Sequence, residues 1–384
     1  MNKMDNKQEK KKSKLKTYAP LAFNIALYFI PCWVAIRYIS PLDINPILFF
    51  TGFIAAVYAA FIFHIIIHEG GHLVFVLLTG YRFSSFRIFS FMWVKEGETV
   101  KFKRHSIAGT GGQCLMSPPD IKNGEMPIVW YNLGGSLMNI IFSTVFLVCF
   151  FLSNSVSVLS GILLLLALLG YSLAILNGVP MRMGALDNDG YNAISLTKNA
   201  EAREVFWMQM KVVEETTRGV RLRDMPAEWF TVPADEAMSN SMVAARGVFA
   251  CNRLMDEERF AEADELMAHM LEIESGMVGM HRSILICDRI YVELIHQNRR
   301  EVIEEKLTKN LQSFMKAMKD TPSILRTQYA IALLYDGDQS KAETIKAQFE
   351  KRAKTYPYPH EIDSERDLMK LAESKFNQPK EENE

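Results

Sequence analysis

The sequence lacks several features that mark common classes of protein. The formal net charge is −1, and no zinc-finger, RNP or helix-turn-helix signature is present, so nucleic acid is not an expected partner. Its five cysteines are scattered without a Cys-x-x-Cys pair: Cys32, Cys114, Cys149, Cys251 and Cys287. This usage favours reduced thiols over a disulfide framework or a cysteine-based metal site. Acidic residues are scarce between residues 18 and 180 and frequent after residue 190, which indicates a membrane domain followed by a soluble one.

Four apolar segments are long enough to cross a lipid bilayer as helices. We predict spans at residues 18–39, 46–79, 126–152 and 156–177. Residues 1–17 carry seven lysines and are expected to form a retained basic tail at the anionic face of the bilayer. Positive charge precedes the first span and recurs between the second and third. Both termini are therefore predicted to be cytoplasmic, in a multi-pass protein of the cell membrane.

Residues 81–107 change to the alternating pattern of β-strands. Two runs with alternating apolar side chains flank the segment Glu96-Gly97-Glu98, which is typical of a turn, so a small cytoplasmic β-hairpin is predicted. This hairpin would either cap the membrane domain or offer a strand edge to an extended substrate. The Gly- and Pro-rich segment that follows, residues 109–120, is expected to be a flexible connector.

The segment HEGGH places titratable side chains inside the second predicted span. Such groups are costly at bilayer depth, and their presence there points to function. His68 and His72 are four residues apart and therefore share one face of a helix, so both imidazoles can bind one metal ion. Glu69 directly follows the first histidine, where it can take a proton from bound water. The spacing predicts a zinc site.

Such a site needs a third protein ligand, because two histidines leave a catalytic zinc ion incomplete. The last apolar segment is broken at Asn177 and Pro180, and two aspartates, Asp187 and Asp189, follow on a glycine-containing loop. Either aspartate is a candidate ligand from a separate span. Asn139 is another polar residue at membrane depth, where it either bonds a neighbouring helix or supports the active site.

In combination, these motifs resemble the site-2 protease family of intramembrane zinc metallopeptidases. The motifs are HEGGH in an apolar helix, Gly135-x-x-x-Asn139, and Asn177-x-x-Pro180 followed by Asp-Gly, and they cover about residues 46–192. The resemblance implies a three-helix catalytic core, with the asparagine and proline of the third motif shaping the loop near the active site. No PDZ-like segment lies between the predicted spans, so a PDZ-free member is expected.

The same resemblance implies that His68, His72 and an aspartate bind Zn²⁺ while Glu69 acts as the general base. Here the interval between the proline and the Asp-Gly pair is longer than in the family. Asp189 is the preferred third ligand because it alone keeps the following glycine, and Asp187 is the alternative. The predicted activity is hydrolysis of peptide bonds in membrane-embedded or membrane-adjacent protein substrates.

Two other functions are compatible with these residues. His64 extends the histidines to a ladder with four-residue spacing, which would also suit a metal transporter. The acidic groups cluster at one membrane edge instead of along a crossing path, which favours catalysis and leaves His64 a packing or supporting residue. A membrane scaffold with an idle metal site is the second alternative.

The soluble half, residues 191–384, has helical periodicity throughout, interrupted by a Pro-containing loop at residues 224–235. Pairs of amphipathic helices recur at roughly the tetratricopeptide period, so a cytoplasmic, all-α, TPR-like domain is predicted. Residues 240–356 would bind a cytoplasmic protein partner, or the module would only stabilise the protease.

Overall fold

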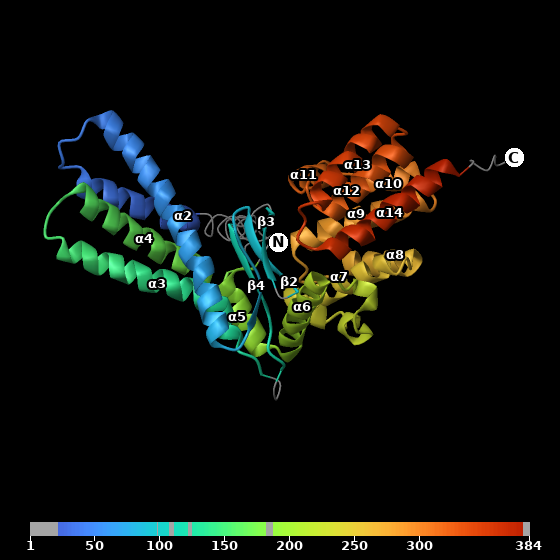
Figure 1. The fold of residues 1–384 in the computed structure, drawn as a ribbon, viewed down its shortest axis with the longest axis horizontal. Coiled ribbons are helices and arrows are strands. Elements are labelled where there is room, and N and C mark those ends of the chain that lie inside the picture. Colours follow the sequence, from blue (N-terminus) through green and yellow to red (C-terminus); the bar gives the residue numbers. More distant parts are fainter. Residues whose placement is uncertain (1–21, 98, 107–110, 122–124, 182–186, 379–384) are drawn as a thin grey trace, which may run out of the picture. The chain divides into compact units, whose positions relative to one another are not determined.

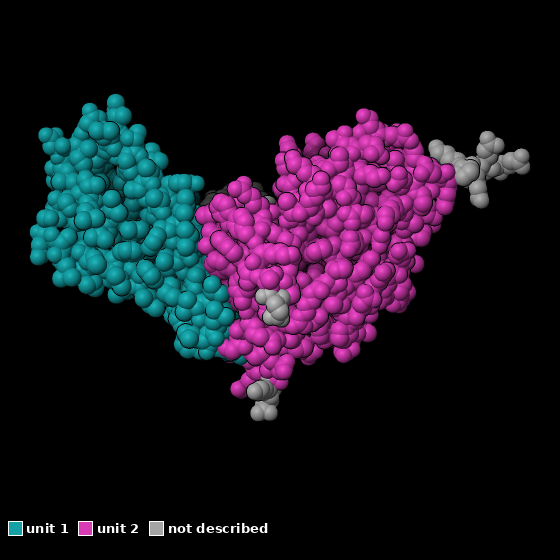
Figure 2. All heavy atoms as spheres, viewed as in Figure 1, with its two compact units in different colours: residues 1–79, 127–182, 187–194 teal, residues 80–126, 183–186, 195–384 magenta. Residues whose placement is uncertain are grey.

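The computed structural model describes residues 22–97, 99–106, 111–121, 125–181 and 187–378. The predicted basic tail, residues 1–17, lies outside them. The described chain is mostly helical and divides into two compact units. The first contains residues 1–79, 127–182 and 187–194, and the second contains residues 80–126, 183–186 and 195–384 (Figure 2).

Four helices of the first unit are long and apolar enough to cross a membrane, which confirms the predicted number of spans. They are Ala22–Ile39, α2 (Pro46–Leu78), α3 (Ile128–Leu152) and α4 (Val158–Gly178). The helix α2 begins where the sequence provides a start signal, because the Asn45 side chain accepts hydrogen bonds from the first turn and Pro46 follows it. Helices α2, α3 and α4 pack against one another (Figure 1).

Glycine sets how closely α2 and α3 approach. A Cβ atom added at Gly71 would lie 2.5 Å from the Gly134 carbonyl oxygen, so the two backbones touch at this point. A Cβ atom at the neighbouring Gly70 would meet nothing within 4 Å. Small residues allow this kind of contact between membrane helices, where packing replaces the hydrophobic effect as the driving force. The contact brings the HEGGH turn of α2 against α3.

The second unit begins with a four-stranded antiparallel sheet in the order β3-β2-β1-β4. The strands are β1 (Arg82–Ile88), β2 (Phe91–Glu96), β3 (Thr99–Arg104) and β4 (Gly112–Ser117). The predicted turn at Gly97 is present, with a positive φ of 60°. The predicted hairpin was incomplete, because a second turn at Phe89, whose φ is also positive, divides its first half into two strands.

The segment predicted to be a flexible connector contains β4, and this prediction was wrong. Its residues Gly112–Ser117 pair with β1 along the whole strand. Glycine and proline at its ends suggested a loop, but pairing with a distant strand outweighs such local preferences. The strand β4 also packs against the helix α6 (Ala200–Arg218), where Trp207 Nε1 donates to the Pro119 carbonyl oxygen at 3.1 Å.

Helices make up the rest of the second unit. The helix α5 (Asp189–Lys198) begins in the first unit and ends in the second, and after α6 the chain forms α7 (Ser241–Asp256), α8 (Phe260–Glu272), α9 (Gly279–Ile295), α10 (Arg300–Lys306), α11 (Lys309–Ala317), α12 (Pro322–Ala330), α13 (Gln339–Ala353) and α14 (Pro359–Asn377). TPR-like repetition and the boundary near residue 190 stay predictions. In the structure, the sheet packs with the helices of the same unit, as the ion pair of Arg82 in β1 with Glu214 in α6 illustrates.

Candidate metal centre

Two histidines of α2 and one aspartate of α5 converge on a single point in the first unit. The Nε2 atoms of His68 and His72 are 3.1 Å apart. One carboxylate oxygen of Asp189 lies 3.1 Å from His68 Nε2 and 3.3 Å from His72 Nε2. Each of the three side chains is mostly shielded from solvent, with 11–25% exposed. Among the described residues, these three form the group of metal-binding side chains with mutually close ligand atoms.

Backbone contacts orient the histidines. His72 Nδ1 donates to the Tyr131 carbonyl oxygen of α3 at 2.7 Å, so the Nε2 atom of the neutral ring carries a lone pair directed at the site. Gly135 lies beside both rings: a Cβ atom there would be 2.6 Å from the ring of His68 and 2.7 Å from His72 Nε2. Only glycine therefore fits at this turn of α3 without moving the rings.

The geometry fits a small tetrahedral cation. Lone-pair atoms of two imidazoles and a carboxylate repel one another at 3.1–3.3 Å unless a proton or cation lies among them. Ligands bound at about 2.0–2.1 Å around a tetrahedral ion stand about 3.3 Å apart, which is close to the separations found here. Two nitrogens and one oxygen also leave the fourth position of such an ion for water or substrate.

Asn188 holds the aspartate in place, and its role was missed from the sequence. It is buried directly before α5, as the N-cap residue, and uses its whole amide group. Its Nδ2 atom donates to two carbonyl oxygens at the end of α4, and its Oδ1 atom accepts from two backbone amides; the partners are Leu176, Val179, Met181 and Tyr191. The sequence did contain a signal for this role, because asparagine is a preferred N-cap residue and here it directly precedes the Asp-Gly pair that begins a helix.

The glycine of the Asp-Gly pair has a packing role. A Cβ atom at Gly190 would lie 2.2 Å from the Gly178 carbonyl oxygen and 3.0 Å from the Pro180 nitrogen. The first turn of α5 therefore sits directly on the broken end of α4. Asp187 precedes this clamped turn and does not join the group of close ligand atoms.

The other predicted site residues lie at different distances from this centre. Glu69 is buried on α2 beside His68, with 9% of its surface exposed. Asn139 is fully buried and contacts His64, at 3.1 Å between Oδ1 and Nδ1, while His64 Nε2 donates to the Leu166 carbonyl oxygen at 2.7 Å. These contacts tie α2, α3 and α4 together one helical turn before His68. Asn177 donates to the Leu173 carbonyl oxygen of its own helix.

Two histidines on a helix long enough to span a membrane, a buried glutamate beside them and the Asp189 carboxylate of α5 form a group that could hold a metal ion, as in the metallopeptidase class. The comparisons with known proteins lead to the same class. The model of Peptidase family M50 matches residues 56–345, more than half of the chain, and the chain belongs to this family. No curated protein and no solved structure matches it.

Proposed function

We propose that this protein is an intramembrane zinc metalloprotease of the site-2 type without a PDZ domain, which hydrolyses peptide bonds of membrane-embedded or membrane-adjacent substrates. The observation that carries the proposal is the convergence of His68, His72 and Asp189 at separations that suit one tetrahedral ion. Membership of Peptidase family M50 and the four apolar helices support it.

Each residue of the site has a chemical role in this proposal. His68, His72 and Asp189 would hold Zn²⁺, which lowers the pKa of water and polarises a peptide carbonyl. Glu69 accepts the proton of the attacking water and delivers it to the leaving amine. Its burial beside His68 favours this role, because a water-excluded site strengthens interactions between charges.

Other parts of the chain would place the protein in the membrane and bind its partners. We propose a multi-pass protein of the cell membrane with both termini cytoplasmic. Residues 240–356 would form a TPR-like surface for a cytoplasmic protein partner. The support is the helical content of this region and the apolar surface of the four spans, which needs a lipid bilayer. The substrate would be a membrane protein or a peptide released from one.

The test uses purified full-length protein in detergent. Bound zinc is measured first, and cleavage of model transmembrane peptides is then measured with and without a chelator. The Glu69→Gln variant should retain zinc and lose cleavage, because glutamine keeps the shape of the side chain but cannot take a proton. Zinc binding without turnover in the wild-type protein would favour the scaffold function, and metal flux in vesicles would favour a transporter.

A further inference from the structure

A second candidate site lies in the second unit. It contains none of the residues of the candidate metal centre. A cavity of about 520 Å³ opens among α6, α7, α9, α12, α14 and the strand β4. Its volume is within the range of about 300–1,000 Å³ that is typical of sites for small ligands. Apolar side chains such as Val212, Phe249 and Leu368 line part of the wall, and charged side chains line the rest.

The charges on the wall are unbalanced. Five carboxylates face two arginines, Arg221 and Arg326; the acids are Asp256, Asp288, Asp320, Glu361 and Glu365. The wall also holds two histidines: burial and the nearby Arg352 and Arg87 lower the pKa of His105 to about 4, and His360 lies 3.6 Å from the Asp363 carboxylate. An acidic wall of this kind repels anionic ligands and attracts cations.

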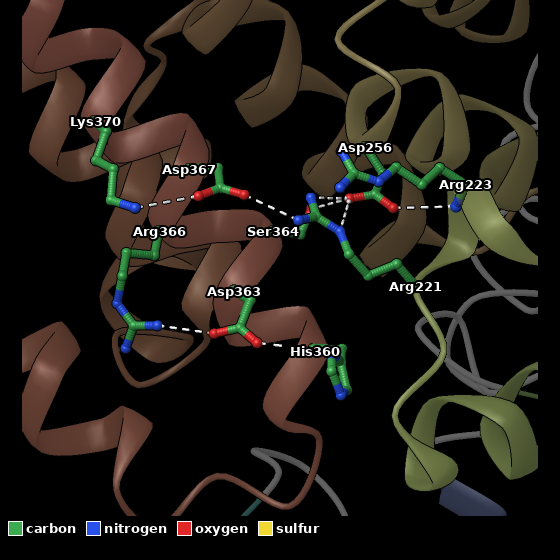
Figure 3. A network of polar contacts seen from close by, with 9 residues as sticks. All are labelled: Arg221, Arg223, Asp256, His360, Asp363, Ser364, Arg366, Asp367 and Lys370. Atoms are coloured by element: carbon green, nitrogen blue, oxygen red, sulfur yellow. Dashed lines mark hydrogen bonds and ion pairs between the residues drawn. The ribbon is translucent and has the colours of Figure 1, made fainter.

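Both arginines are already engaged by carboxylates. Arg326 is 2% exposed and donates to Asp288 at 2.6 Å and to Glu365 at 2.9 Å. Arg221, which follows α6, donates to Asp256 of α7 and to Asp367 of α14 (Figure 3). It therefore links these two helices. Asp256 also accepts from the Ser364 hydroxyl and the Arg223 backbone amide. Asp256, Asp288 and Glu365 therefore have little hydrogen-bonding capacity left for a ligand.

Glu361 differs from Asp256, Asp288 and Glu365, which the two arginines hold, and from Asp320, which is exposed. In the described part of the chain its carboxylate accepts one hydrogen bond, from the Tyr356 hydroxyl at 3.1 Å, and has no cation within ion-pair distance. Burial and repulsion by Glu365 raise its pKa to about 7. Tyr358 lies beside Tyr356, with ring centroids 5.8 Å apart, and both tyrosines line the same cavity as Glu361. A cation next to an aromatic ring and an acid gains from both.

We propose that this cavity binds an organic cation, in which a protonated amine or a guanidinium group on an apolar or aromatic body pairs with Glu361. A divalent metal ion is disfavoured because Asp256, Asp288 and Glu365 are held by the two arginines, and among the described residues no group of three close metal-binding side chains includes Glu361. The cationic group has two possible sources, a free amine or the basic side chain of a peptide. The proposal does not depend on the peptidase activity.

The experiment measures binding to the full-length protein by calorimetry with two pairs of probes. Tyramine is compared with tyrosol, in which a hydroxyl replaces the ammonium group. Acetyl-Ala-Arg-Ala-amide is compared with the peptide in which citrulline replaces arginine. At least one cation should bind about tenfold or more tightly than its neutral analogue, since a charged hydrogen bond in a shielded site has this strength. Binding of tyramine alone identifies a free amine, and binding of the peptide alone identifies a basic side chain.

Variants test the role of Glu361 directly. Glu361→Gln keeps an acceptor for Tyr356 and should lose about tenfold or more in affinity for the cation, whereas Glu361→Asp keeps the charge and should lose less. Glu373→Gln makes the same change on α14 outside the cavity, where Glu373 pairs with Lys346, and should bind like the wild type. The proposal is overturned if neither cation binds better than its neutral analogue, or if Glu361→Gln binds the cation as tightly as the wild type.

Discussion

A methyl group at Gly135 should displace both histidines of the candidate metal centre. A Cβ atom added there would lie 2.6 Å from the ring of His68 and 2.7 Å from His72 Nε2. To reach an ordinary contact of 3.4 Å, the His68 ring would have to move by about 0.8 Å. Metal–ligand distances tolerate about 0.2 Å, so this displacement is several times larger than the site can absorb.

Movement of α3 instead of the rings would not relieve the site. The two helices already touch at the neighbouring glycine, where a Cβ atom on Gly134 would be 2.9 Å from the Gly71 carbonyl oxygen, so α3 has no room to shift toward α2. If α3 retreated, the Tyr131 carbonyl oxygen that orients His72 would move away with it. Either response disturbs the ligands, so we expect Gly135→Ala to lower zinc affinity by about tenfold to hundredfold, the usual effect of disturbing the groups that orient a ligand.

The assay is zinc retained by the purified variant after dialysis against buffers of defined free zinc, with peptide cleavage measured on the same samples. Gly70→Ala is the matched control, because its Cβ atom meets nothing and alanine favours the helix. Gly70→Ala should retain wild-type zinc and activity. Wild-type zinc affinity in Gly135→Ala would refute the reasoning, because it would mean that the rings do not need their present positions.

Three further predictions concern other residues. Asn188→Ala should lower zinc affinity about tenfold, as measured by the same dialysis, because four hydrogen bonds that place α5 are lost; Asn188→Asp keeps only the acceptors and should rescue part of it. The folded state raises the pKa of Glu361 to about 7, so this residue stabilises the fold below about pH 4.5 and that contribution is lost as the pH rises through 7. Glu361→Gln should therefore raise the free energy of unfolding at pH 8 by about 1–3 kcal/mol and change it little at pH 4.5; an equal change at both pH values would contradict this. Arg326→Met should destabilise the protein by about 3–5 kcal/mol in denaturant titrations, because it leaves Asp288 and Glu365 without their cation; a loss below 1 kcal/mol would show that these acids are protonated or solvated.

Local chemistry made several features predictable from the sequence. The spans follow from runs of apolar residues, because length and hydropathy alone decide whether a helix can cross a bilayer. The shared face of His68 and His72 follows from the period of the helix. The turn at Gly97 follows from the freedom of glycine to adopt a positive φ. Each of these depends on residues close together in the chain.

Contacts between distant segments decided the rest. The strand β4 looks like a loop by itself and exists because β1 supplies its hydrogen bonds. Two aspartates were candidates for the third ligand, and Asp189 reaches the histidines because Asn188 fastens the start of α5 to the end of α4. The unpaired carboxylate of Glu361 appears only when helices far apart in the sequence assemble around one cavity and use both of its arginines elsewhere. Periodicity reports which face a side chain occupies, but only tertiary packing decides which groups meet there.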